Sequence, residues 1–136
     1  MTTKFTIETP PKESMLNITP QVKQVVEAST VLEGICVVFI PHTTAGLTLN
    51  SIMDSATAQD IKDEIRRLVP TRVDFEHIYD TPADAAGHIK ATLVGASLSL
   101  IISGGDLLLG GSQGIYFCEF DGPRTREVYV KIIGEG

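Results

Sequence analysis

The stretch Gly114–Ile133, "GIYFCEFDGPRTREVYVKII", decides the fold class of this chain. Its two halves, "GIYFCEFD" and "REVYVKII", are rich in aromatic and β-branched residues, which favours strands. Asp121, Gly122 and Pro123 between the two halves are residues that favour a tight turn. Consecutive strands joined by a tight turn run antiparallel, so we expect a largely antiparallel sheet.

The residues before this stretch add further strands and three helices. Strands are predicted at "TTKFTIET", "ICVVFI", "GLTLN", "LSLII" and "LLLG", because each is an alternating or continuous apolar run. Capping residues and prolines predict helices that run from Thr19-Pro20 to Gly34, from Asp54 or Ser55 to Pro70, and from Thr81-Pro82 to about Gly95. With about seven or eight strands and about three helices, the chain is predicted to be one α+β domain over residues 1–136, with a largely antiparallel or mixed sheet.

Composition and charge narrow the classes of partner. A net charge of −6, from 17 acidic and 11 basic residues, repels a nucleic-acid backbone, whereas a few converging donors can still bind one small phosphorylated molecule. No apolar run approaches the roughly 20 residues needed to span a bilayer, and no leader pattern is visible. We therefore expect a cytoplasmic protein without nucleic-acid or membrane partners. Cys36 and Cys118 lie in apolar runs, which indicates buried free thiols.

The three histidines of the chain all fall at the boundaries of predicted elements. His42 follows the strand "VVFI", His77 lies in "FEHIYD" and His88 lies in "AAGHIK". Three imidazoles are the ligand set of an open zinc site, which keeps one position for water or substrate. Their separations of 35 and 11 residues match no local ligand signature, so the spacing leaves both a shared metal site and three unrelated histidines open.

Other polar residues lie where a ligand could be bound. Thr43 and Thr44 could offer hydroxyl and amide groups to an anion, or they could satisfy a turn. Gln113 lies in the glycine-rich segment "GGSQG", which is either a ligand-binding loop or a plain connection between strands. Arg124 could present its guanidinium to a phosphate or carboxylate, or lie incidentally in a structural turn.

Taken together, "PHTTAGLTLN", "GHIKATLVGASLSLII", "QGIYFCEFDGPR" and "VYVKIIGEG" resemble the YjbQ-like family over almost the whole chain, from about Phe5 to Gly134. The resemblance implies a compact α+β protein that forms a homotrimer, with its characteristic histidines gathered near a subunit boundary. It also implies secondary thiamine-phosphate synthase activity, in which a pyrimidine methyl diphosphate and a thiazole phosphate are joined with loss of pyrophosphate.

Carried onto this chain, the resemblance implies a set of roles for individual residues. The metal ligands would be His42, His77 and His88, with zinc as the ion and magnesium as an alternative for a diphosphate substrate. Catalytic groups would be Asn50, Gln113 and Arg124, and contacts to the phosphorylated substrate would come from Thr43, Thr44, Lys90 and Arg124. Asp80, Asp84 and Glu119 are the carboxylates available to orient the imidazoles.

Three alternatives to the synthase stay open, one of which is a purely structural trimer. An imidazole-rich site favours a metal-dependent hydrolase, because zinc lowers the pKa of its bound water to about 7. A trimer that binds a metal or metabolite without catalysis is the second alternative. It is favoured by two departures from the family pattern: Ser51 stands where glutamate is common, and Ser112 stands where tryptophan is common.

Overall fold

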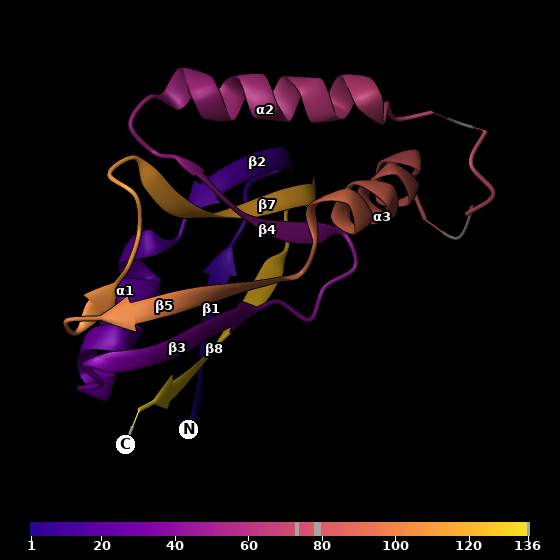
Figure 1. The fold of residues 1–136 in the computed structure, drawn as a ribbon. Coiled ribbons are helices and arrows are strands. Elements are labelled where there is room, and N and C mark those ends of the chain that lie inside the picture. The colour runs from indigo at the N-terminus through magenta and orange to yellow at the C-terminus, as the bar shows by residue number, and fades with distance from the viewer. Residues whose placement is uncertain (73, 78–79, 136) are drawn as a thin grey trace.

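The chain folds into two antiparallel sheets that pack against each other, with two helices over the smaller sheet and a third helix packed into the core beside the larger one (Figure 1). This computed structural model describes residues 1–72, 74–77 and 80–135. The first sheet has five strands in the order β1 (Thr2–Glu8), β8 (Thr125–Gly134), β3 (Glu33–Phe39), β5 (Ser97–Ser103) and β6 (Asp106–Leu107). The second sheet has three strands in the order β2 (Lys12–Asn17), β7 (Gln113–Gly122) and β4 (Ala45–Ser51). The α+β fold and the antiparallel pairing are therefore confirmed.

In the described part of the chain, three helices cover parts of these sheets. Helix α1 (Thr19–Ser29) packs on the inward face of the five-stranded sheet, and its Val22 and Val26 are buried in the main core. Helices α2 (Ser55–Leu68) and α3 (Pro82–Val94) lie over the three-stranded sheet (Figure 1). They enclose a second, smaller apolar cluster around Tyr116, Cys118 and Phe120 of β7. Among the described helices, none is long and apolar enough to cross a membrane.

Strands β7 and β8 are consecutive in sequence but belong to different sheets. Strand β7 pairs with β2 and β4, whereas β8 pairs with β1 and β3. The connection between them contains a cis peptide bond between Gly122 and Pro123. The turn predicted at Asp121–Arg124 is therefore the place where the chain passes from one sheet to the other.

The predicted boundaries of the first helix need correction. Helix α1 ends at Ser29 rather than at Gly34, because Thr30 adopts a left-handed conformation and its N–H caps the helix by donating to the Glu27 carbonyl. Gly34 lies instead inside β3, where a Cβ atom would come within 2.2 Å of the Ile133 carbonyl oxygen. Its glycine marks a close approach between neighbouring strands, and not a helix stop. Strand β2 was not predicted at all.

The other two helices begin and end close to their predicted positions. The Asp54 side chain caps α2 by accepting a hydrogen bond from the Ala56 N–H, and the Thr81 hydroxyl caps α3 by accepting one from the Asp84 N–H. Gly95 follows the last residue of α3, as predicted. Both cysteines are buried free thiols, and burial raises the pKa of Cys36 to about 11 and that of Cys118 to about 12.

Candidate metal and anion site

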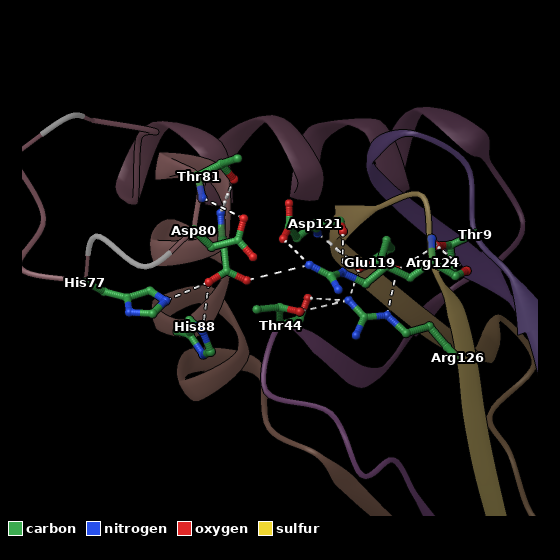
Figure 2. A network of polar contacts seen from close by, with 11 residues as sticks. Thr9, Thr44, His77, Asp80, Thr81, His88, Glu119, Asp121, Arg124 and Arg126 are labelled. Carbon is green, nitrogen blue, oxygen red and sulfur yellow. Dashed lines mark hydrogen bonds and ion pairs between the residues drawn. The ribbon is translucent and has the colours of Figure 1, made fainter.

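Two of the three histidines meet at one aspartate near the start of α3. The Nε2 atoms of His77 and His88 lie 2.7 and 3.2 Å from the same carboxylate oxygen, Oδ2 of Asp84 (Figure 2). The two imidazole rings are 5.0 Å apart between centroids and nearly perpendicular. One ligand atom from each of these residues lies within 4.8 Å of the other two. His77, Asp84 and His88 are called the His-Asp-His cluster below.

The local sequence of α3 explains how this cluster forms. Thr81 caps the helix and Pro82 occupies its first turn, which fixes the position of Asp84 in that turn. His88 follows four residues later, so its side chain lies on the same face of the helix as that of Asp84. His77 approaches from the segment that precedes the helix. Two residues one helical turn apart on α3, together with one residue from the segment before it, are therefore sufficient to build the cluster.

Asp84 is the buried member of the cluster, and its two histidine partners are more exposed. The Asp84 side chain is 10% exposed, against 38% for His77 and 41% for His88. Burial alone would raise the pKa of the Asp84 carboxyl, but the hydrogen bond with His77 and the charge of His88 outweigh it, so the pKa is lowered. The cluster thus combines a buried, ionised carboxylate with two imidazoles that solvent can reach.

Arg124 brings a cation to the other oxygen of this carboxylate. Its Nη2 lies 3.7 Å from Oδ1 of Asp84 and 2.7 Å from Oδ2 of Asp121, and its Nε donates to the Asp121 carbonyl. These contacts fix the guanidinium, whose side chain is still 41% exposed. A guanidinium held in this way beside the His-Asp-His cluster can receive a phosphate or carboxylate from solvent.

A buried ion pair supports the turn that carries Arg124. Glu119, which has no exposed surface, accepts hydrogen bonds from Nε and Nη2 of Arg126 and from the hydroxyl of Thr9. The same hydroxyl accepts a hydrogen bond from the Arg124 N–H, and Arg126 also donates to Oγ1 of Thr44 (Figure 2). Burial alone would raise the pKa of Glu119, but these donors outweigh it and the pKa is lowered. The turn is thus stabilised by a network of buried hydrogen bonds around Glu119 and Arg126.

His42 lies outside the His-Asp-His cluster. Its Nε2 accepts a hydrogen bond of 2.8 Å from the backbone N–H of Glu127 in β8. Burial, and next the positive charge of Arg126, lower the pKa of His42, which favours the neutral ring. A neutral ring that accepts at Nε2 carries its proton on Nδ1, so within one chain neither nitrogen offers a lone pair to a metal. The structure thus joins His77 and His88 with Asp84, and not with His42.

Lys90, predicted as a substrate contact, is 1% exposed and faces away from the cluster. Its Nζ lies 3.0 Å from Oε1 of Glu13, and a position two residues beyond His88 points to a different side of the helix. Thr44 is buried and bonded to Arg126, so it contacts the supporting network rather than solvent. Thr43 is exposed at the start of the same segment.

Asn50 and Gln113, predicted as catalytic groups, lie at the opposite end of the β4–β7 ladder from Arg124. Ser51 pairs with Gln113, whereas Ala45 pairs with Glu119, and six residue steps along a strand span about 20 Å. The Asn50 side chain accepts from the N–H of Ser51, and that of Gln113 accepts from the N–H of Gly110. One chain therefore does not bring these two amides to the His-Asp-His cluster.

The sequence predicts Asp84 only as a residue that orients the imidazoles, and it does not predict Arg126 or Thr9 as site residues. For Asp84 a signal was present, because its spacing of four residues from His88 on a predicted helix puts both on one face. Thr9 and Arg126 meet Glu119 through contacts between distant strands. Nothing in the local sequence indicates such a contact.

Comparison with known proteins agrees with the resemblance seen in the sequence. The family model described as UPF0047 protein YjbQ-like matches residues 3–135 of the chain. The chain belongs to the YjbQ/UPF0047 family. Among its relatives in this family, UPF0047 protein MJ1081 of Methanocaldococcus jannaschii is 44% identical over 97% of this chain and 94% of the relative. YugU of Bacillus subtilis is 39% identical over 94% of this chain and 96% of the relative.

Solved structures of UPF0047 proteins have the same fold. A YjbQ/UPF0047 protein of Clostridium acetobutylicum superposes with a TM-score of 0.91 at 43% identity, covering 96% of this chain and 99% of the other. The protein SSO2532 of Sulfolobus solfataricus, described as YjbQ-like and of unknown function, superposes with a TM-score of 0.93 at 31% identity, covering 99% and 97%. These likenesses establish the family and the fold, and the names of these relatives state no activity.

Proposed function

We propose that this protein is a metal-dependent enzyme that acts on a small phosphorylated metabolite at the His-Asp-His cluster. The observation that carries the proposal is the convergence of two imidazoles and one carboxylate, all within 4.8 Å, beside the fixed guanidinium of Arg124. Three such ligands with solvent on one side are the donor set of an open divalent site. Arg124 would bind the phosphate of the metabolite.

The donor set fits zinc better than magnesium. Magnesium prefers an octahedron of oxygen ligands, whereas imidazole nitrogens favour zinc and similar transition ions. His77, Asp84 and His88 would hold the ion, and Asp84 would keep its ionised form, which its lowered pKa supports. A zinc ion in such a site supplies a bound water of lowered pKa and polarises a phosphoryl oxygen.

The roles of the neighbouring residues follow from their contacts. Arg124 orients the anionic group of the substrate, and Asp121 holds Arg124 in place through a hydrogen bond of 2.7 Å. The synthase reaction implied by the family resemblance releases pyrophosphate, and charge neutralisation at its leaving group is a task that Arg124 and a metal ion could share. Hydrolysis of a phosphorylated metabolite is the second candidate, which the two imidazole ligands favour because they suit zinc.

We propose further that the working form is a homotrimer, in the cytoplasm, assembled through the outward face of the five-stranded sheet. Ile133, Ile35 and Ile101 lie in register on β8, β3 and β5, and each is at least 50% exposed. An exposed apolar row across three strands is typical of a surface that another chain covers. Two buried free thiols support a reducing compartment.

Charging the apolar row is expected to dissociate the assembly. Ile35→Lys would put an ammonium at the centre of the row, and the molar mass measured by light scattering should fall from that of three chains to that of one. Leu68→Lys is the matched control, because Leu68 is 71% exposed on α2 and should leave the mass unchanged. A wild-type protein that is monomeric at micromolar concentration would contradict the trimer.

Zinc binding is expected to depend on the cluster and not on His42. Removing a ligand should cost more than removing an outer partner, so His77→Ala, His88→Ala and Asp84→Asn should each lower zinc affinity by at least about 100-fold. His42→Ala is the matched control, and it should keep the wild-type affinity because its Nε2 is bonded to the Glu127 N–H. Competition against a zinc-binding dye measures these affinities on protein freed of its ions.

Turnover of phosphorylated substrates then tests the proposed reaction. Arg124→Met should leave zinc affinity within about threefold of wild type and raise KM for a phosphorylated substrate by about tenfold or more, the loss expected for one charge-assisted hydrogen bond. If zinc binds but no phosphorylated compound is turned over with zinc, manganese or magnesium, the enzyme proposal fails and a metal-binding trimer is left. If no ion binds, the cluster is a structural ion network.

A further inference from the structure

Strand β1 forms one edge of the five-stranded sheet, and among the strands that the structure describes it pairs only with β8. The backbone N–H of Thr9, directly after β1, donates to the Arg124 carbonyl on the β8 side. Because the N–H and C=O groups of successive residues point alternately to the two sides of a strand, those of Lys4, Thr6 and Glu8 point to the free edge. This edge therefore offers a row of donors and acceptors to a further strand.

The side chains along this edge alternate between two kinds of surface. Lys4, Thr6 and Glu8 are exposed on the outward face of the sheet. Phe5 and Ile7 point inward and are half-buried against the main core. The Lys4 side chain is 49% exposed, so its ammonium can reach a carboxylate of another molecule. The segment "KFTIE" thus has opposite charges at its ends, an apolar residue inside each and a threonine in the middle.

This segment is complementary to itself when two copies run antiparallel. Centred on Thr6, the pairing puts Lys4 opposite Glu8 of the second copy. It also puts Phe5 opposite Ile7, and Thr6 opposite its own counterpart. Opposite charges, an aromatic with a β-branched residue, and two threonines are all cross-strand pairs that stabilise a sheet. Two-fold symmetry repeats the charged and the apolar pair, so every position of the segment has a favourable partner.

The other registers are less favourable. A shift by one residue would put the outward side chains of one copy opposite the inward side chains of the other. Centring the pair on Lys4 would place two ammonium groups side by side, which is destabilising. Centring it on Phe5 would put Lys4 opposite Thr6, so neither charge would have an opposite charge directly across from it. The chemistry of the side chains therefore selects the register centred on Thr6.

We propose that the free edge of β1 is an interaction surface for a second copy of this chain, whose own β1 adds antiparallel to it across a two-fold axis at Thr6. The occupant is a second copy because the complementary charges belong to the same segment. The contact is separate from the apolar row proposed for the trimer, since β1 pairs with β8 only as far as Lys131, and Ile133 lies beyond. The pairing thus depends neither on the trimer nor on the metal site.

The mass of a variant without the trimer contact tests the pairing. Five residues along one edge make a contact smaller than a standard interface, so we expect a dissociation constant on the order of 0.1–1 mM. Ile35→Lys is the background, and its molar mass by sedimentation equilibrium should rise from that of one chain at about 10 μM toward that of two at about 2 mM. A mass of one chain throughout this range would overturn the proposal.

Variants of the edge check the location and the register. In the same background, Thr6→Pro removes an N–H that points to the free edge and leaves the bonds to β8 intact, so it should fold and stay monomeric. Thr6→Val is the matched control, because it keeps the N–H and should still pair. Lys4→Glu should prevent pairing, and adding Glu8→Lys should restore it. Equal masses for the two Thr6 variants, or no recovery in the double variant, would overturn the proposal.

Hydrogen exchange gives a second readout at the level of single amides. The N–H groups of Lys4, Thr6 and Glu8 should exchange about threefold more slowly at about 2 mM protein than at about 50 μM, because pairing protects them. Those of Phe5 and Ile7 point to β8, and their exchange should not depend on concentration. A doubled mass without slower exchange at the first three amides would place the contact elsewhere and overturn the proposal.

Discussion

Replacing Arg126 with methionine is expected to lower the free energy of unfolding by about 3–5 kcal/mol at neutral pH. The change leaves Glu119 ionised with no exposed surface and without its two strongest donors, Nε and Nη2 of Arg126. Removing one partner of a buried ion pair costs more than the pair itself contributes, because the other charge stays buried without compensation. Urea unfolding at constant protein concentration, followed by circular dichroism, measures the loss.

The loss should shrink in acid. In the wild type the folded pKa of Glu119 lies below its ordinary value of about 4.3, so its contribution is complete above that value and is lost as the pH falls through the folded pKa. Without Arg126, burial raises the pKa instead, and protonation then favours the folded variant. Arg67→Met is the matched control: Arg67 is 75% exposed in its pair with Glu64, and its loss should leave the free energy of unfolding almost unchanged. A deficit for Arg126→Met that is the same at pH 3 and pH 7 would contradict this account.

Gly122→Ala should destabilise the protein by about 3 kcal/mol and weaken the anion site as well. A Cβ atom at Gly122 would lie 2.0 Å from the Pro10 carbonyl oxygen and 3.1 Å from that of Lys12. Both are backbone atoms, so no change of rotamer relieves the clash, and either β7 or the connection between β1 and β2 must move. Because Asp121 and Arg124 flank this position, the move should also displace the guanidinium.

Two measurements separate these effects. Thermal unfolding reports the loss of stability, and phosphate binding, followed by chemical shifts on protein freed of metal, reports the position of Arg124. Gly111→Ala is the matched control, since its added Cβ meets no atom within 4 Å and should change neither quantity by much. A Gly122→Ala variant as stable as Gly111→Ala would show that the backbone of the β1–β2 connection yields without cost.

Local chemistry explains which parts of the fold could be predicted from the sequence. The Thr81-Pro82 and Asp54 caps act within one turn of their helices, so the starts of α2 and α3 were readable. The end of α1 was not, because Thr30 takes the left-handed conformation that the prediction reserved for a glycine. Strand β2 was not predicted because the apolar and polar residues of "KESMLN" alternate only weakly. The strand is stabilised instead by its pairing with β7.

In the candidate site, too, the contacts within one helix could be predicted from the sequence, and the contacts between distant segments could not. Asp84 and His88 are four residues apart on one helix, and their proximity follows from helical geometry. His77 comes from the segment before that helix, and the family resemblance rather than its spacing suggested that it would join His88. The ion pair joins Glu119 of β7 in one sheet to Arg126 of β8 in the other, and Thr9, which directly follows β1, also bonds Glu119. Contacts of this kind depend on the completed topology, which no local pattern encodes.

The position of β8 also sets an order of events during synthesis. Strand β8 lies between β1 and β3 in the sheet and is translated after both. During synthesis, β1 and β3 therefore cannot pair with β8 until the last part of the chain has been made. Among the strands that the structure describes, β1 pairs only with β8, so a nascent chain that ends before Thr125 leaves β1 unpaired and one edge of β3 open. Open strand edges invite pairing with other chains, so this interval is when a molecular chaperone would be most useful to the emerging polypeptide.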